Sequence, residues 1–265
     1  MACCALLLLT GSPSPAQELN ETALPDAPFQ LEQGWHALLN GRDLSGWHEM
    51  AAWRGDPKQL NQWLTTSSVQ WSRLGSPTSL NAKREPGPVI MNGIPAHTNN
   101  LISDESFGDV ELYVEFQIAK GSNSGVYLEG LYEVQIFDSF GVDSPMTTGD
   151  AGAIYERWGN DRGFEGSAPL KNASRRPGEW QSYHIWFRTP HFENGRRVSE
   201  AEFLKVVYNG VIVQSHYKCS GPTRSGLERA ESATGPLMLQ GDHGPVAFRN
   251  IYIRPLREAG AVHLR

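Results

Sequence analysis

The chain has little cysteine. Three cysteines occur among its 265 residues, and two of them, Cys3 and Cys4, lie in an apolar run near the N-terminus. If that run is removed as a signal, Cys219 is the only cysteine left, so neither an intramolecular disulfide nor a thiolate metal cluster can form. We therefore expect stability to come from a packed core and Cys219 to be a buried thiol.

Long apolar runs and blocks of positive charge are lacking as well. The run Ala2–Leu9 is too short to span a bilayer, so we expect no transmembrane segment in the mature chain. Ser14-Pro15-Ala16 follows it, which is typical of a cleaved signal peptide over residues 1–16 and of a secreted or periplasmic protein. The chain has a net charge of -6 and no block of basic residues, which argues against nucleic-acid binding.

Several motifs of well-known enzyme classes are absent. His97, His184 and His216 do not have the spacing of a zinc-binding H-E-x-x-H pair. The chain has no G-x-S-x-G, no P-loop and no G-x-G-x-x-G string, which argues against serine acyl transfer, nucleotide hydrolysis and dinucleotide binding.

The sequence does carry the alternation of apolar and polar residues that is typical of β-strands. Few segments have helical periodicity without an interrupting glycine or proline, and 27 glycines and 17 prolines supply many turns. The strongest hairpin signal is Asn209-Gly210, and Asn194-Gly195 is a second one. The predicted strand blocks are Val110–Ile118, Gly125–Glu129, Tyr132–Phe137, Tyr183–Arg188, Phe203–Val213 and Val246–Arg254.

These blocks predict an all-β fold, in which two antiparallel sheets stack as a sandwich or jelly roll. All-β sandwiches of this length are often one domain, and no repeat or low-complexity stretch divides the chain. We expect a flexible mature N-terminus over residues 17–28, a single domain over residues 29–258, and a tail over residues 259–265.

Strings of residues along the whole mature chain resemble the 3-keto-disaccharide hydrolase family. No single string is specific, but together they occur in the order of the family's pattern. They are Asn40-Gly41-Arg42-Asp43-Leu44-Ser45-Gly46-Trp47, Phe107-Gly108-Asp109, Asn123-Ser124-Gly125-Val126-Tyr127, Tyr132-Glu133-Val134-Gln135, Gly152-Ala153-Ile154-Tyr155, Pro177-Gly178-Glu179-Trp180-Gln181, Asn209-Gly210, Leu239-Gln240 and Phe248-Arg249-Asn250-Ile251.

The resemblance implies a concanavalin-like jelly roll that acts on glycosides whose C3 hydroxyl has been oxidised to a ketone. Such a ketone acidifies the C2 hydrogen, so a base can remove it, the C1 substituent can leave, and water can add. The oxidation must happen elsewhere, which implies a functional link to a separate sugar 3-dehydrogenase. Two alternatives stay open: a conventional two-carboxylate glycosidase and a non-catalytic lectin-like module.

Glu133 is the first candidate for the base. It alternates with Gln135 on one face of a strand whose other face, Val134 and Ile136, is apolar, so the carboxylate and the amide would project together. A solvated strand face is the ordinary alternative. Whether Glu129 joins them depends on the turn: two residues would pair Leu128 with Glu133, and three would pair Glu129 with Glu133.

If Glu129 shared the face of Glu133, repulsion would raise one pKa, or both carboxylates could hold a divalent cation. Asp138 is either a loop cap or a ligand for the sugar.

The remaining candidates are spread along the chain. His243, in the string Gln240-Gly241-Asp242-His243-Gly244, is the second catalytic candidate. It could act as an acid, donate to an enediolate or ligate a metal, and a surface histidine in a turn is the ordinary alternative. Asp242 would either orient His243 or cap the turn.

We assign Asn123, Gln135, Tyr155 and Gln240 to substrate binding, together with Glu129 and Asp138, and each could instead have an ordinary turn or strand role. Among the tryptophans, Trp35, Trp47 and Trp180 are expected in the framework, whereas Trp53, Trp63 and Trp158 are possible sugar platforms.

Overall fold

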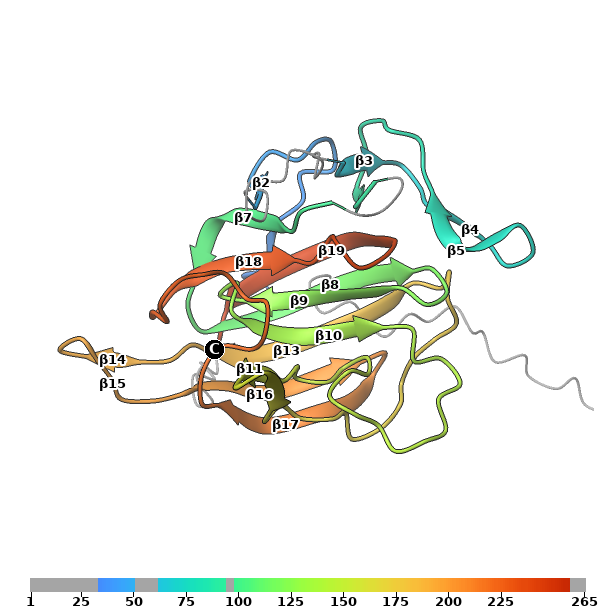
Figure 1. Cartoon of the computed structure of the whole chain (residues 1–265). Coiled ribbons are helices and arrows are strands. Elements are labelled where there is room, and N and C mark those ends of the chain that lie inside the picture. The colour runs from blue at the N-terminus through green and yellow to red at the C-terminus, as the bar shows by residue number, and fades with distance from the viewer. Residues whose placement is uncertain (1–32, 51–61, 94–97, 258–265) are drawn as a thin grey trace, which may run out of the picture.

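The computed structural model describes residues 33–50, 62–93 and 98–257, and its regular structure over these ranges is entirely β (Figure 1). Within them, no helix is long and apolar enough to cross a membrane. The predicted signal peptide, the N-terminal segment 17–28, the tail 259–265 and Trp53 lie outside the described residues.

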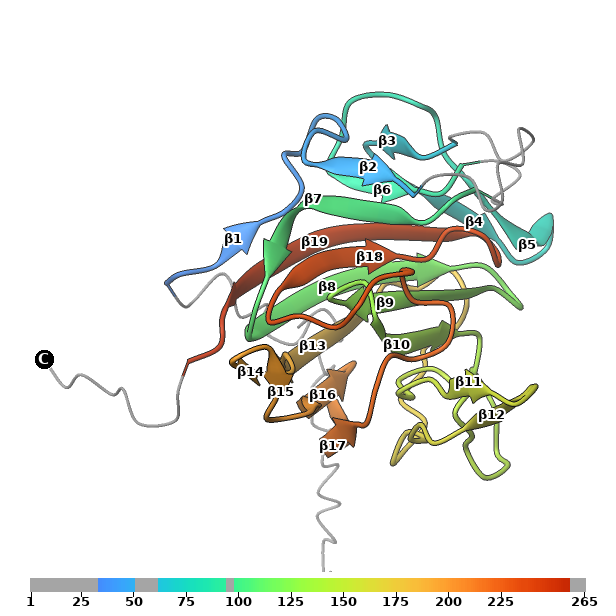
Figure 2. The ribbon, with the colours of Figure 1, turned by 60° about the vertical axis from the view of Figure 1, so that its left-hand side comes forward.

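Two antiparallel sheets form the two layers of the molecule (Figures 1 and 2). The larger sheet has eight strands in the order β17-β16-β13-β8-β19-β6-β3, and β1 also pairs with β19. Its strands are β1 (His36–Ala37), β3 (Leu64–Thr66), β6 (Val89–Met91), β8 (Val110–Ile118), β13 (Gln181–Arg188), β16 (Ala201–Tyr208), β17 (Val211–Cys219) and β19 (Val246–Pro255).

The smaller sheet has five strands in the order β10-β9-β18-β7-β2. Its strands are β2 (Trp47–Glu49), β7 (Leu101–Phe107), β9 (Asn123–Leu128), β10 (Tyr132–Phe137) and β18 (Gly235–Leu239). Three two-stranded ribbons are β4 (Gln70–Ser72) with β5 (Ser76–Asn81), β11 (Arg157–Gly159) with β12 (Arg162–Phe164), and β14 (Phe192–Glu193) with β15 (Arg196–Arg197).

The core lies between the two sheets and follows from the alternation of side chains along each strand. In β8 the inward residues include Val114 and Phe116, and in β10 they include Val134 and Ile136; all four are fully buried. Burying each such side chain contributes about 1.5–3 kcal/mol. The residues between them, among them Glu133, therefore point to the outer faces.

The structure confirms the predicted fold class, an all-β sandwich of antiparallel sheets. Strands β8 and β10 have the predicted bounds. The Asn209-Gly210 turn also forms as predicted: Tyr208 pairs with Val211, and both turn residues have positive φ, 48° and 82°, as a two-residue hairpin turn requires. Cys219 is a buried thiol, and its burial raises the pKa of the thiol.

One prediction about the tryptophans is wrong. Trp63 was expected in a loop as a possible sugar platform, but it is fully buried, and its indole donates a hydrogen bond of 2.8 Å to the carbonyl of Asn99. Trp47 is buried, as expected of a framework residue, and Trp158 is 47% exposed. Of the three proposed platforms, Trp158 alone is both described and accessible.

Candidate active site

The predicted base lies on the outer face of the five-stranded sheet. In the pairing of β9 with β10, Tyr127 stands opposite Glu133 and Gly125 stands opposite Gln135. Directly opposite residues share a face, so these four positions form one patch on the side of the sheet away from the core. Met238 of β18 pairs with Tyr127 and extends the same face across the next strand.

The Glu133 carboxyl is buried and held in place from two sides. Glu133 is 2% exposed, and the Tyr127 hydroxyl donates a hydrogen bond of 2.7 Å to its Oε2. Its other oxygen lies over Gly125, where an added Cβ would come within 2.1 Å of Oε1. Glycine at position 125 therefore leaves the space that this carboxyl occupies.

Burial raises the pKa of Glu133 to about 8. The hydrogen bond from Tyr127 lowers the pKa by a lesser amount, and the negative charge of Asp242 raises it further. A carboxyl with this pKa, once ionised, is a much stronger base than an exposed glutamate.

The backbone around Glu133 ties a distant loop to the site. The amide of Glu133 donates a hydrogen bond of 3.0 Å to the Thr223 hydroxyl, which in turn donates to the carbonyl of Leu131 at 3.0 Å. The residue after Thr223 is Arg224, whose amide donates to the carbonyl of Glu156. This loop, about 90 residues along the chain from Glu133, thereby lies at the edge of the site.

Tyr155 extends the outer face beyond β10. Its amide donates a hydrogen bond of 3.2 Å to the carbonyl of Glu133, and the preceding Ile154 forms an isolated bridge with Val134. Because Ile154 points into the core with Val134, Tyr155 points outward with Glu133. The Arg224 side chain interacts with the Tyr155 hydroxyl, and its guanidinium lies 3.9 Å from the centre of the Trp158 ring.

Asp242 and His243 form a hydrogen-bonded pair in the loop after β18. The distance between His243 Nδ1 and Asp242 Oδ1 is 2.6 Å, and this hydrogen bond raises the pKa of His243. The Gln240 side-chain nitrogen lies 3.3 Å from the same Nδ1, and the carbonyl of His243 accepts from the amide of Asn123. With Nδ1 turned to Asp242, the opposite nitrogen, Nε2, is the one that can exchange a proton with a ligand.

Three predicted binding residues present amide oxygens that lack a partner. Among the described residues, Asn123 Oδ1, Gln135 Oε1 and Gln240 Oε1 are buried and form no hydrogen bond. The amide of Gln240 donates to the carbonyl of Gly125, so the two glutamines flank that glycine on the neighbouring strands. Buried polar atoms are normally paired, so this cluster suits a ligand that offers several hydroxyl donors.

The structure corrects both pairings expected for Glu129. The loop between β9 and β10 consists of Glu129, Gly130 and Leu131, so Leu128 pairs with Tyr132, and Tyr127 pairs with Glu133. Glu129 itself adopts φ 55° in this loop. Its carboxyl is buried at the end of the sandwich in a small cavity lined by apolar side chains, among them Phe107 and Leu237.

Asp138 lies after the end of β10 and acts as a turn cap. Its Oδ2 accepts a hydrogen bond of 2.9 Å from the amide of Gly121, and its own amide donates to the carbonyl of Ser122. The structure thus brings six predicted residues together on one face and leaves Glu129 and Asp138 apart from it. The six are Asn123, Glu133, Gln135, Tyr155, Gln240 and His243.

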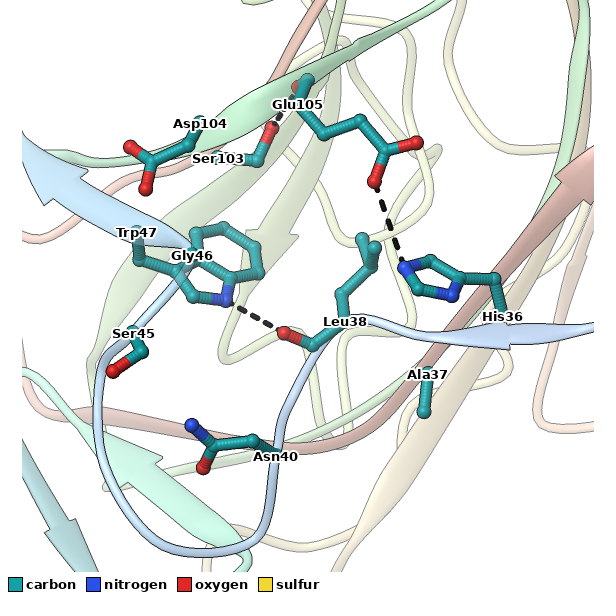
Figure 3. Close-up of a pocket in the computed structure, with 10 residues that line it drawn as sticks. All are labelled: His36, Ala37, Leu38, Asn40, Ser45, Gly46, Trp47, Ser103, Asp104 and Glu105. Atoms are coloured by element: carbon teal, nitrogen blue, oxygen red, sulfur yellow. Dashed lines mark hydrogen bonds and ion pairs between the residues drawn. The ribbon is translucent and has the colours of Figure 1, made fainter.

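A larger cavity lies elsewhere, between the N-terminal segment and β7 (Figure 3). Its volume is about 230 Å³, and Trp47 and Ser103 belong to its buried wall. The indole of Trp47 donates to the carbonyl of Leu38, and the Ser103 hydroxyl donates to the carbonyl of Glu105. These polar groups are satisfied within the protein, so the cavity lacks the unpartnered atoms that distinguish the Glu133 face.

The described residues form no cluster of the side chains that usually bind metal ions. Within the described ranges, no three side chains of histidine, cysteine, aspartate or glutamate gather closely enough to hold an ion. The divalent cation considered from the sequence therefore stays a prediction.

Sequence reasoning missed two residues of this face, Tyr127 and Arg224. Tyr127 could have been found, because it alternates with Gly125 and Asn123 along one strand. Nothing near Arg224 in the sequence marks it, because its place depends on a loop that returns from a distant part of the chain.

An all-β sandwich whose outer face carries a buried carboxyl and unpartnered buried amides suits a protein that acts on carbohydrates. The chain belongs to the family described as the 3-keto-alpha-glucoside-1,2-lyase-like domain, which matches residues 34–254. This match confirms the resemblance found in the sequence.

Solved structures agree with this class. A crystal structure from Parabacteroides distasonis, named a "putative glycosyl hydrolase", is 28% identical and superposes with a TM-score of 0.58 over 84% of each chain. A second one of the same name and organism is 19% identical, has a TM-score of 0.54, and covers 88% of this chain and 97% of its own, which shows the shared fold. No curated protein sequence matches the chain. The chain is thus a carbohydrate-active enzyme that acts on glycosides.

Proposed function

We propose that this enzyme cleaves 3-keto-glycosides or 3-keto-disaccharides by proton abstraction at C2, elimination across C1 and C2, and hydration. The observation that carries the proposal is the buried Glu133 carboxyl, held by Tyr127 over Gly125. The same face carries Tyr155 and the three unpartnered amides, and His243 lies in the loop that contacts Asn123 and Gln240. Substrate binding falls to Asn123, Gln135, Tyr155 and Gln240. Glu129 and Asp138 contribute only indirectly, through the loop and the turn that they shape.

In the first step, ionised Glu133 takes the C2 proton, and the electrons of the C–H bond move toward the C3 ketone to give an enolate. An enolate oxygen is stabilised by donors placed where its charge develops. The Tyr155 hydroxyl and the Arg224 guanidinium supply such donors on the face that carries Glu133.

In the second step, the enolate reforms the ketone while C1 and C2 become doubly bonded and the C1–O bond breaks. The departing oxygen takes a proton from His243, whose hydrogen bond to Asp242 favours the protonated ring. The aglycone therefore leaves as a neutral alcohol.

In the third step, water adds to the unsaturated ketone. Its hydroxyl bonds to C1, its remaining proton returns to His243, and C2 recovers a proton from Glu133. Both residues end in their starting states, and the net reaction is hydrolysis. The substrate ketone has to be made by another enzyme, so we also propose a functional link to a sugar 3-dehydrogenase. We further propose a secreted or periplasmic location, which rests on the predicted signal peptide alone.

The test is aglycone release by the purified protein from a 3-keto-glucoside and from its unoxidised parent, with and without a chelator. We expect release from the keto sugar alone, and a loss of about a thousandfold or more in the Glu133→Gln variant, as for removal of a catalytic base. Glu193→Gln, an exposed glutamate of the β14–β15 ribbon, is the matched control and should retain full activity.

Other outcomes lead to other functions. Equal release from both sugars would favour a conventional two-carboxylate glycosidase. Sugar binding without any release would move the chain to the lectin-like class. Loss of aglycone release in the presence of the chelator would show that the site needs a divalent cation.

A further inference from the structure

The backbone of Glu133 is held along the outer edge of the five-stranded sheet. β10 is the last strand in the order of that sheet, so its outer edge pairs with irregular segments. There the carbonyl of Glu133 accepts a hydrogen bond of 3.2 Å from the amide of Tyr155, and the amide of Glu133 donates one of 3.0 Å to the Thr223 hydroxyl. Both backbone groups of the proposed base are thus attached to segments that carry a proposed enolate donor, Tyr155 itself and Arg224, which follows Thr223.

The two donor segments are also bonded to each other, so β10 and these segments form a closed ring of hydrogen bonds. The amide of Arg224 donates a hydrogen bond of 2.9 Å to the carbonyl of Glu156, the residue after Tyr155. At the other end of Arg224, the guanidinium lies 3.9 Å from the centre of the Trp158 ring. Arg224 is therefore fixed at its backbone and at its charged group, and its distance from Glu133 depends on the links of the ring.

One link of this ring depends on a side chain. Thr223 is 6% exposed, and its hydroxyl accepts from the amide of Glu133 and donates at 3.0 Å to the carbonyl of Leu131. The other two links join backbone amides to backbone carbonyls and do not depend on side chains. Because the amide of Thr223 also donates to the Leu131 carbonyl, loss of the hydroxyl leaves the loop attached and changes its spacing from Glu133.

We propose that Thr223 is a positioning residue, whose hydroxyl sets the distance between the Glu133 carboxyl and the Arg224 guanidinium. The inference rests on the proposed function, because it takes Glu133 as the base and Arg224 as a donor to the enolate. Charge develops on the enolate oxygen only after the C2 proton has begun to leave, so a displaced donor slows the reaction without weakening the binding of the substrate. A fall in kcat with an unchanged KM therefore distinguishes this role from substrate binding.

The experiment measures kcat and KM on a 3-keto-glucoside for Thr223→Val, which keeps the shape of the side chain and removes the hydroxyl. We expect kcat to fall about tenfold or more and KM to stay within about twofold. Thr223→Ser restores a hydroxyl and should keep kcat within about threefold of the parent protein. In an Arg224→Gln background, Thr223→Val should lower kcat less than about twofold further, because the hydroxyl acts through Arg224.

Thr66→Val is the matched control. Thr66 is 1% exposed, and its hydroxyl likewise accepts from a backbone amide and donates to a backbone carbonyl, both of Ser68, but it lies in β3 of the other sheet. We expect this variant to lose a similar amount of stability and to keep its kcat. An equal loss of kcat in both valine variants, a loss that Thr223→Ser does not restore, or a rise in KM alone would overturn the positioning role.

Hydrogen exchange of single backbone amides provides a readout that needs no turnover. We expect Thr223→Val to speed exchange at the amides of Glu133 and Arg224, and Thr66→Val to change neither. Unchanged exchange at both amides would overturn the link. If the parent protein does not cleave the keto sugar, the proposed function fails, and hydrogen exchange alone decides whether Thr223 joins the two segments. If Thr223→Val does not fold, Thr223→Ala carries the same measurements.

Discussion

Buried glutamates occur on the outer faces of both sheets, but their surroundings differ. On the eight-stranded sheet, Glu111 and Glu115 are 4% and 3% exposed; on the five-stranded sheet, Glu133 is 2% exposed. Glu115 accepts a hydrogen bond of 2.6 Å from Arg249, whereas Glu133 accepts one from the neutral Tyr127.

Glu111 shows the effect of positive partners most clearly. Its carboxyl lies 2.6 Å from both Arg254 and His184. Burial raises the pKa of Glu111, but the hydrogen bonds and charges of His184 and Arg254 outweigh it, so the pKa stays below its usual range. Burial of Glu133 is not balanced in this way, and its pKa rises to about 8. Two glutamates of similarly low exposure thus become a structural anion on one sheet and a candidate base on the other, and the charge of the partner contributes to the difference.

The comparison predicts that Glu111 serves stability and not turnover. Glu111→Gln removes the carboxylate between Arg254 and His184, and we expect it to lower the free energy of unfolding by about 3 kcal/mol. Chemical denaturation at pH 7 measures this change, while kcat/KM should stay within about twofold. Glu193→Gln, at an exposed position of the β14–β15 ribbon, is the control and should leave the transition unchanged. A large loss of turnover in a still folded Glu111 variant would break the contrast between the two sheets.

Gly125 offers the complementary test on the five-stranded sheet. Gly125→Ala would place a methyl group 2.1 Å from Glu133 Oε1, so the carboxyl has to move. We expect kcat/KM to fall about a hundredfold, because a shift of about 1 Å in a catalytic group costs that much. Gly121→Ala is the control, because its turn position has open space around it and turnover should be unchanged. Its φ of 72° costs that variant some stability. Full activity in Gly125→Ala would show that the position of Glu133 does not matter for turnover.

Glu129 sharpens the comparison, because it is buried without a described hydrogen-bond partner for either oxygen. Burial raises its pKa to about 8, against an unfolded value near 4.5. The folded state then holds more protons than the unfolded state between these values, so stability falls as pH rises through this window. We expect Glu129→Gln to match the parent protein near pH 4.5 and to be more stable by about 4–5 kcal/mol above pH 8, because each unit of pKa shift is worth about 1.4 kcal/mol.

Thermal unfolding at several pH values, with Glu133→Gln measured alongside, separates the contributions of the two carboxyls. A stability difference between Glu129→Gln and the parent that does not change with pH would contradict the raised pKa.

The sequence predicted the parts of the fold that depend on local pattern. Alternation located β8 and β10, and Asn209-Gly210 predicted its hairpin, because both signals lie within a few neighbouring residues. The same alternation put Glu133 and Gln135 on one outer face.

Other features could not be read from local pattern. The predicted pairing of Glu129 was wrong because the turn was expected to begin at Gly130. Glu129 instead belongs to the turn and has a positive φ, which is uncommon for a glutamate. The predicted exposure of Trp63 was wrong, because the burial of a residue outside a clear strand depends on the segments that pack over it. Arg224 was missed because its contacts with Tyr155 and Trp158 arise from chain segments about 70 residues apart.

The segment that carries Tyr155 has a second consequence. β10 is the last strand of the five-stranded sheet, and Ile154 bridges it to Ser167 through two isolated pairs. These pairs occupy backbone groups that would otherwise be open to a strand from another molecule. A deletion in this segment would remove a site residue and also leave the edge of the sheet open to pairing with another molecule. The same few residues therefore affect both turnover and solubility.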